Sequence, residues 1–159
     1  MRKVRAELEE NGWRCAIEGE NDFRLEGATA VVAGKPDLIA TMPGHVLVVD
    51  GKTGRRRDSD VWQVLIYLFA IVRGRRDLVG NLRGEVVYKD GQTIGIRQAE
   101  LSEARIDEMA GMVKVFAADE PPAKVPSLYE CRRCNIGPLD CPQRFQPDRE
   151  LAAAAVADF

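Results

Sequence analysis

The chain has 159 residues, of which 45% are hydrophobic, 30% are charged and 6% are aromatic. This length is sufficient for one domain with a hydrophobic core that needs no disulfide bonds. The 23 Lys and Arg residues are balanced by 25 Asp and Glu residues, which leaves a formal charge of −2. The near-neutral charge excludes binding of nucleic acid by bulk basicity, so any such contact must come from local basic clusters.

The distribution of apolar residues bears on the compartment of the protein. No apolar run approaches the ~18 residues of a membrane span. The charged N-terminal segment lacks the apolar stretch of a signal peptide. We therefore expect a cytoplasmic protein that makes no membrane contact.

Hydrophobic periodicity predicts a mixed α/β fold. The run 45–50 is almost continuously apolar, which is typical of a strand covered on both faces. The expected strands are 13–18, 22–33, 37–40, 45–50, about 84–89 and about 93–97, with a hairpin turn at Asp90-Gly91. The expected helices are 2–11, 58–72 with a cap at Asp58-Ser59, and 102–117.

The C-terminal part of the chain differs in composition from the rest. Residues 119–126 are rich in proline and predict a stiff, extended linker. The alanine-rich tail over 150–156 is expected to be helical. We therefore divide the chain into a core, residues 1–118, and a linker with a cysteine segment, residues 119–159, which belongs to the same domain.

Two carboxylates lie at the ends of apolar strands. Asp37 follows Gly34-Lys35-Pro36, and Asp50 ends the next apolar run thirteen residues later. Adjacent strands that end in carboxylates can bring them close together, and carboxylate and water ligands suit Mg²⁺ or Mn²⁺. Lys52 points to the same face as Asp50, because side chains alternate along a strand. The alternative is that these residues only form turns and solvated strand ends.

A second pair of polar residues lies on the predicted helix over 58–72. Gln63 and Tyr67 are four residues apart and therefore share a face, beside the apolar stripe. A solvated helix face has no need of a tyrosine at this position. The pair is either part of a polar site or a tyrosine at the edge of the core with an incidental glutamine.

These residues together resemble a known family. Gly34-Lys-Pro-Asp37, Asp50-Gly-Lys52 and Gln63-x-x-x-Tyr67 look like the successive motifs of the PD-(D/E)xK nuclease superfamily. The most similar branch is that of the RecB-like exonucleases, including the CRISPR-associated RecB-like nucleases. The resemblance implies a restriction-endonuclease-like core, with a mixed central β-sheet flanked by helices, that hydrolyses DNA phosphodiester bonds.

The resemblance also implies roles for individual residues. Asp37 and Asp50 would hold Mg²⁺ or Mn²⁺, Lys52 would be the catalytic lysine, and Gln63 and Tyr67 would position the DNA or the active-site groups. The implied partners are DNA, either single-stranded or at duplex ends, and a helicase or CRISPR adaptation proteins.

The chain departs from the RecB-like pattern in its histidine and glycine residues. Those enzymes often carry a metal-binding histidine near the first helix, but no histidine precedes Asp37 here. A glutamate is expected to take its place, and among several candidates we favour Glu20, in the polar turn after the first strand. His45 is expected to be a solvated residue at the start of a strand. Gly51 is expected to mark a close approach of the backbone to metal or substrate.

Three of the four cysteines are close together in the sequence. Cys131-Arg-Arg-Cys134 places two thiolates on one tight turn and Cys141 follows, while Cys15 stands alone near the N-terminus. In a reducing compartment, such a cluster predicts metal binding, with Cys15 as the fourth ligand. The iron–sulfur members of the RecB-like branch have similar spacing, which implies a [4Fe–4S] cluster in a C-terminal clasp. Zinc and unligated thiols are the alternatives.

A short basic run follows Lys52. Arg55, Arg56 and Arg57 adjoin the predicted phosphate site, and we expect them to bind the DNA backbone. Trp13 and Trp62 are expected to pack in the core and not to stack on bases. Two rival functions remain at this point: a non-catalytic DNA-binding or recruiting module with a structural metal, and a zinc-stabilised RNA-binding domain, which the neutral charge and scarce aromatics disfavour.

Overall fold

The computed structural model describes residues 1–28, 30–75, 77–78, 80–120 and 126–145. The chain divides into two compact units, Met1–Ala118 and Asp119–Phe159. Among the described residues, no helix is both long enough and apolar enough to cross a membrane.

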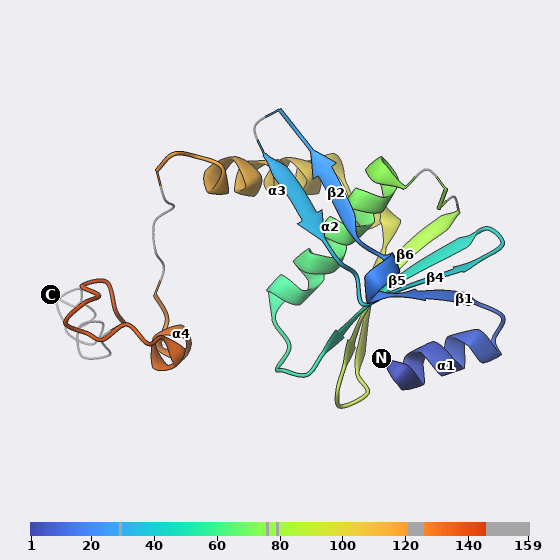
Figure 1. The fold of residues 1–159 in the computed structure, drawn as a ribbon, viewed down its shortest axis with the longest axis horizontal. Coiled ribbons are helices and arrows are strands. Elements are labelled where there is room, and N and C mark those ends of the chain that lie inside the picture. The colour runs from blue at the N-terminus through green and yellow to red at the C-terminus, as the bar shows by residue number, and fades with distance from the viewer. Residues whose placement is uncertain (29, 76, 79, 121–125, 146–159) are drawn as a thin grey trace, which may run out of the picture. The chain divides into compact units, whose positions relative to one another are not determined.

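A five-stranded mixed sheet forms the centre of the first unit (Figure 1). Its strands, in spatial order, are β1 (Arg14–Ile17), β4 (Leu38–Met42), β5 (His45–Lys52), β6 (Asn81–Tyr88) and β7 (Thr93–Arg97). Neighbouring strands are antiparallel except β5 and β6, which are parallel. A parallel pair needs a long crossover connection, and the helix α2 (Asp58–Gly74) supplies it. The predicted mixed α/β fold is confirmed.

Both faces of the sheet are covered, and β5 shows why its sequence is continuously apolar. Val46 and Val48 face α2 and belong to one buried cluster. Leu47 and Val49 face the opposite side, where Val4 and Leu8 of α1 (Arg2–Glu10) pack against them. Figure 1 shows α1 and α2 on opposite sides of the sheet. The two faces of β5 are thus buried by helices from different parts of the chain.

The helix α2 packs unusually close to β6. A Cβ atom at Gly84 would lie 2.3 Å from Val64 Cγ1, so only glycine fits beneath the helix. The helix begins at Asp58, and its N-cap is Arg57 and not the predicted Asp58-Ser59 pair. The reason is that Asp60, within the first turn, accepts a hydrogen bond from the Arg57 backbone N–H at 3.0 Å.

The predicted single strand over 22–33 is wrong. The structure has a hairpin of two strands, β2 (Phe23–Glu26) and β3 (Val31–Gly34), which form a separate two-stranded sheet. The Gly27 N–H donates to the Ala30 carbonyl at 2.8 Å and closes the turn between them. Residues 27–33 are all Gly, Ala or Val apart from Thr29, so no charged residue or proline marks the reversal in the sequence.

The remaining elements of the first unit match their predicted types. Gly91, in the turn between β6 and β7, has a φ of 85°, which favours glycine. The helix α3 (Glu103–Phe116) is capped by Ser102, whose hydroxyl accepts from the Arg105 N–H at 3.3 Å. Two short 3₁₀ helices, Glu18–Glu20 and Gln98–Glu100, follow β1 and β7.

The second unit contains a short helix, α4 (Leu128–Arg133), where the sequence predicted only a tight turn. Ser127 caps it, because its hydroxyl accepts a hydrogen bond from the Glu130 N–H at 3.2 Å. Cys131 therefore lies within a helix, and Cys134 follows its last residue. The predicted tail helix over 150–156 and part of the predicted linker, 121–125, lie outside the described residues.

Candidate active site

The antiparallel pairing of β4 and β5 brings the two predicted carboxylates to the same end of the sheet. Leu38 pairs with Val49, so the next positions along the two strands are Asp37 and Asp50. Asp37 Oδ2 accepts a hydrogen bond from the backbone N–H of Gly51 at 2.8 Å, which fixes the Asp37 side chain against β5. The sheet register therefore positions both acids.

Asp50 is buried, with an exposed fraction of 2%, and Lys52 is its cationic partner. Lys52 Nζ lies 2.6 Å from Asp50 Oδ2, as expected for residues two apart on one strand face. Among the buried side-chain oxygen and nitrogen atoms of the described residues, Asp50 Oδ2 is the one that has no hydrogen bond beside its ion pair. A buried carboxylate oxygen of this kind favours positive charge next to it.

The surroundings of Asp50 raise the pKa of its carboxyl group above the ordinary value. The largest cause is burial, which disfavours the charged form. The Lys52 ammonium opposes this effect, and the negative charges of Asp37 and Asp60 add to it. Keeping the buried carboxylate charged therefore costs free energy, and a bound cation would offset that cost.

The first three turns of α2 complete the polar network. Gln63 Oε1 accepts a hydrogen bond from Lys52 Nζ at 2.6 Å, and Gln63 Nε2 donates to Asp50 Oδ1 at 3.2 Å. Gln63 Nε2 also donates to the Tyr67 hydroxyl at 2.6 Å, and that hydroxyl donates to the Lys35 carbonyl at 3.4 Å. Burial raises the pKa of Tyr67, so the hydroxyl stays protonated at neutral pH. The structure thus brings Gln63 and Tyr67 to the acidic pair.

Two side chains lie near Gly51, and neither of them requires a glycine there, because the Met1 side chain is exposed and flexible. A Cβ atom there would lie 2.7 Å from Met1 Sδ and 3.4 Å from Asp37 Oδ2. The sequence predicted a close approach of the Gly51 backbone to metal or substrate. In this structure the close approach is to the chain itself.

The two carboxylates fit a divalent cation that keeps part of its hydration shell. Among the residues that the structure describes, no group of three or more His, Cys, Asp or Glu side chains could hold a metal ion. Mg²⁺ is commonly held by one or two carboxylates together with waters and substrate phosphates. Asp37 and Asp50 are enough for such a site. Glu20, the predicted third ligand, is exposed at the end of the 3₁₀ helix Glu18–Glu20.

A comparison with sequence families places the chain. Residues 1–141 match the PD-(D/E)XK nuclease superfamily. The chain belongs to this superfamily. Its members are typically nucleases that use Mg²⁺ or Mn²⁺. The family and the mixed sheet together support a restriction-endonuclease-like fold for this PD-(D/E)XK chain.

A comparison with solved structures agrees with the fold. The crystal structure of SSO0001 is similar to this PD-(D/E)XK chain with a TM-score of 0.51 and 19% sequence identity. The similarity covers 91% of this chain and 67% of SSO0001. At this identity the similarity concerns the fold alone. No curated protein matches the chain.

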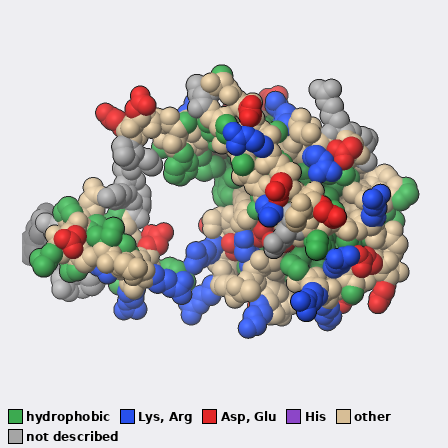
Figure 2. All heavy atoms as spheres, viewed as in Figure 1, with side chains coloured by type: hydrophobic (Ala, Val, Ile, Leu, Met, Phe, Trp, Pro, Cys, Tyr) green, Lys and Arg blue, Asp and Glu red, His purple; other side chains and the backbone are tan. Residues whose placement is uncertain are grey.

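The basic run that follows β5 in this PD-(D/E)XK domain is exposed. Arg55, Arg56 and Arg57 all lie at the surface, in the segment that joins Lys52 to α2. Arg56 donates a hydrogen bond to Gln92 Oε1 at 3.0 Å and lies over the Tyr88 ring, 5.5 Å from its centroid. On the face of the first unit drawn in Figure 2, basic and acidic side chains are interspersed.

The four cysteines are all free thiols. Cys15 is half-buried in β1 and packs against the sheet face that α1 covers, and burial raises the pKa of its thiol. In the second unit, Cys131 and Cys141 are half-buried and Cys134 is exposed. Cys131 Sγ accepts a hydrogen bond from the Phe145 N–H at 3.3 Å. Among the described residues, these thiols do not form a preassembled group of three ligands.

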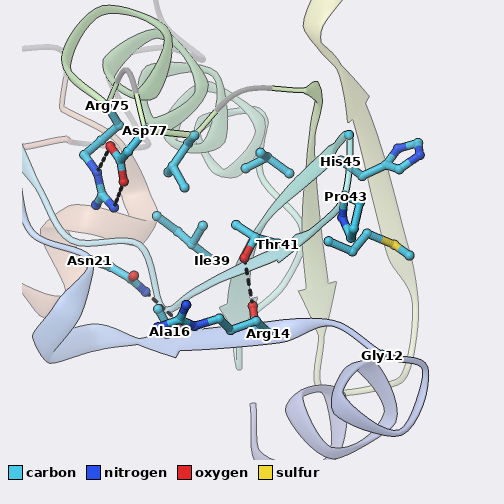
Figure 3. Close-up of a pocket in the computed structure, with 14 residues that line it drawn as sticks. Gly12, Arg14, Ala16, Asn21, Ile39, Thr41, Pro43, His45, Arg75 and Asp77 are labelled. Atoms are coloured by element: carbon cyan, nitrogen blue, oxygen red, sulfur yellow. Dashed lines mark hydrogen bonds and ion pairs between the residues drawn. The ribbon is translucent and has the colours of Figure 1, made fainter.

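A cavity of about 650 Å³ lies at the opposite end of the β4–β5 hairpin from the acidic pair (Figure 3). Its lining includes Arg14, Asn21 and His45, and Arg75 forms a bidentate ion pair with Asp77 at 2.9 and 2.8 Å. None of the five predicted catalytic-site residues lines it. His45 is exposed at the start of β5, as expected. The candidate active site is thus identified by its group of acidic, basic and polar side chains and not by the volume of a cavity.

Sequence reasoning missed three residues that shape the site. Asn21 is buried and donates hydrogen bonds to the Ala16 carbonyl at 2.9 Å and the Pro36 carbonyl at 3.3 Å, which holds the turn before Asp37. Asp60 and Tyr88 are buried and joined by a hydrogen bond of 2.8 Å. An asparagine in a polar turn and an aspartate in the first turn of a helix are common, so neither had a distinctive signal.

Proposed function

We propose that this chain is a metal-dependent deoxyribonuclease, of exonuclease type and in the RecB-like branch of its superfamily. The observation that carries the proposal is the buried Asp50, which lies next to Asp37 and is connected to both Lys52 and Gln63. An ion pair at a strand end has no need of a second carboxylate and a bridging glutamine. In metal-dependent phosphodiester hydrolysis the two carboxylates can hold the metal, the lysine can stabilise the developing charge, and the glutamine can hold them in place.

Each residue has a distinct role in the proposed hydrolysis. Asp37 and Asp50 would hold Mg²⁺ or Mn²⁺, which supplies Lewis-acid activation of water and of the scissile phosphate. Lys52 places its ammonium beside Asp50 and stabilises the negative charge that develops on the phosphate oxygens. Gln63 and Tyr67 are positioning residues, because Gln63 contacts Lys52 and Asp50 directly, and Tyr67 fixes the Gln63 amide. Glu20 is proposed as a further, outer ligand of the metal.

The proposed substrate is DNA, either single-stranded or at duplex ends. Arg55, Arg56 and Arg57 are exposed and follow Lys52 directly, so they can reach the phosphates that flank the scissile one. Such contacts neutralise backbone charge without reading sequence. A helicase is the proposed partner for the unwinding of duplex DNA. CRISPR adaptation proteins are the alternative partners, and the cytoplasm is the proposed compartment.

The cysteines are proposed to hold a [4Fe–4S] cluster, with zinc as the alternative. Cys15, Cys131, Cys134 and Cys141 supply four free thiols, the number that either group requires. The N–H donor to Cys131 Sγ would stabilise a thiolate there. Because these thiols are not preassembled, binding would itself gather the ligands, as is usual when a metal site couples to folding.

The test of the proposed function begins with anaerobic purification, a visible spectrum, and iron and zinc analysis, followed by a nuclease assay with Mn²⁺. We expect cleavage of DNA by the wild-type chain and none by Asp50→Asn, a variant of the same shape that has lost one negative charge. Equal cleavage by both proteins would contradict the proposal. DNA binding without cleavage in the wild type would favour the rival function, a recruiting module with a structural metal.

A further inference from the structure

A buried acid that the proposed chemistry does not use lies at the start of α2. Asp60 is 7% exposed, and its Oδ2 accepts a hydrogen bond from the Tyr88 hydroxyl at 2.8 Å. Tyr88 ends β6 and is 4% exposed. The pKa of Tyr88 is raised, first by its own burial and then by the hydrogen bond to Asp60. Burying a carboxylate is costly unless it has partners, so this pair calls for an explanation.

The Asp60–Tyr88 pair attaches one end of the segment that carries the arginines to β6. The same Asp60 Oδ2 also accepts from the Arg57 N–H at 3.0 Å, which anchors the C-terminal end of the segment. At its N-terminal end, the Lys52 carbonyl accepts from the Lys89 N–H at 2.9 Å. We call residues 53–57 the basic loop. Both of its ends are thus attached to the last residues of β6 and the turn that follows.

The middle of the basic loop is attached to the same hairpin. Arg56 lies over the Tyr88 ring and donates to Gln92, which follows the β6–β7 turn. One exposed arginine is thereby held in place, whereas a solvated arginine samples many rotamers. The contacts at Lys52, Arg56 and Arg57 give the loop a defined shape before any substrate binds.

A cleft of about 410 Å³ lies between the basic loop and the hairpin turn. Thr53 and Gly54 line it on one side, and Tyr88, Lys89 and Asp90 on the other. Its volume is within the range of about 300–1,000 Å³ that small-molecule sites occupy. The cleft begins one residue after the proposed catalytic Lys52, and Lys89 brings an exposed cation to it. Asp90 adds an exposed carboxylate to the cleft, and its Oδ1 accepts a hydrogen bond from the Gln92 N–H at 3.0 Å. Together the basic loop and the hairpin turn carry four exposed cations, Arg55, Arg56, Arg57 and Lys89, against this one exposed carboxylate, so a phosphate-bearing group is the ligand that they favour.

We propose that this cleft is the subsite for the nucleotide next to the scissile phosphate, and that the Asp60–Tyr88 pair is the device that keeps it open. The inference rests on the proposed function and deepens it, because it assigns a place to one nucleotide of the substrate strand. Lys89 contacts the phosphate of that nucleotide. Asp60 and Tyr88 are positioning residues, which act through the backbone of the basic loop.

The first experiment measures DNA binding without chemistry. A fluorescently labelled single-stranded oligodeoxynucleotide of twelve residues is titrated in EDTA with wild type, Lys89→Ala and the control Lys114→Ala, which removes an exposed lysine from α3. We expect Lys89→Ala to weaken binding about three- to tenfold and to reduce the slope of log K against log salt by about 0.7, the value for one phosphate contact on a single strand. Indistinguishable binding by Lys89→Ala and Lys114→Ala would overturn the subsite.

The second experiment separates positioning from simple stability. Asp60→Ala and Tyr88→Phe each remove one partner of the Asp60–Tyr88 hydrogen bond. Asp60→Asn keeps a side-chain oxygen that can accept from the Tyr88 hydroxyl and from the Arg57 N–H. The kinetics are measured at a temperature where circular dichroism shows all variants folded. We expect KM for DNA to rise several-fold in Tyr88→Phe, with a smaller change in kcat. Compared with Asp60→Ala, Asp60→Asn should have a near-wild-type KM. An unchanged KM in Tyr88→Phe would contradict the positioning role.

The two proposals fail in distinguishable ways. If the wild type binds DNA through Lys89 but cleaves nothing in Mn²⁺, the proposed nuclease activity is wrong, and the cleft is a nucleotide-binding site without a scissile phosphate beside it. If the wild type cleaves DNA and Lys89→Ala matches the Lys114→Ala control in affinity and salt dependence, the subsite is wrong and the nuclease activity stands.

Discussion

The candidate active site and the cysteine segment differ in how their residues are held. Asp50, Lys52, Gln63 and Tyr67 form a continuous network within the structure, built on a buried strand and a packed helix. The thiols of the second unit lie on a short helix and the turns after it, and the described residues contain no ready group of three ligands. Rigid elements preorganise the first site, whereas the second would be assembled by the group that it binds.

The largest effect is expected when the Asp50 carboxylate is removed from the preorganised site. Asp50→Ala should reduce DNA cleavage by at least three orders of magnitude, because it removes a metal ligand and leaves Lys52 without its counter-ion. The fold should persist, since neither apolar cluster of the first unit includes Asp50 and its pairing with β6 is through the backbone. A nuclease assay in Mn²⁺ beside a thermal melt measures both effects. Cleavage within tenfold of wild type would remove Asp50 from the proposed machinery.

A mutation in the cysteine segment should remove the bound metal group. Cys134→Ser should abolish the iron content and the broad absorption near 400 nm, because an assembled site loses its metal when one ligand is lost. Cys15→Ser is the matched variant in the first unit, and the same loss there would assign the fourth ligand to Cys15. A colourless wild-type protein with one equivalent of zinc would show that the cysteines hold zinc and not an iron–sulfur cluster. Full iron retention in Cys134→Ser would exclude Cys134 as a ligand.

A subtler change probes the preorganisation of the active site. Tyr67→Phe removes the hydroxyl that fixes the Gln63 amide, while the ring and its edge contact with Phe23 remain. We expect kcat to fall about tenfold and the free energy of unfolding to fall by about 1 kcal/mol, the usual cost of one hydrogen bond. Steady-state kinetics and urea titration give the two values. An unchanged kcat would mean that Gln63 needs no support from Tyr67.

The smallest expected effect concerns pH and stability. The pKa of Asp50 is raised in the folded chain, so the folded state binds this proton more tightly than the unfolded state does. Without metal, the stability that this proton contributes is lost as pH rises through the raised pKa. Asp50→Asn should therefore unfold at a temperature equal to or a few degrees above that of wild type at neutral pH, and the difference should disappear at acidic pH. A variant that melts lower at neutral pH would show that the ion pair with Lys52 stabilises the fold.

The sequence alone determined the elements that carry the site. The continuous apolar run of β5 predicted a strand with two covered faces, and the spacing of Gln63 and Tyr67 predicted a shared helix face. Both predictions depend on local periodicity, which the chain carries in its covalent order. The family resemblance also came from short motifs at these elements, and the superfamily match over residues 1–141 confirms it at that level.

Only the tertiary structure decided which residues meet. The register of β4 on β5 brings Asp37 to the Gly51 N–H, and the close packing of α2 on Gly84 brings Gln63 to Lys52. Likewise, Asp60 and Tyr88 are 28 residues apart in the chain and meet in a buried hydrogen bond. Such contacts depend on strand pairing and helix docking across long sequence separations, and no local pattern encodes a partner at that distance. The sequence thus supplied the chemical groups, and the packing of α2 on the sheet joined them into one site.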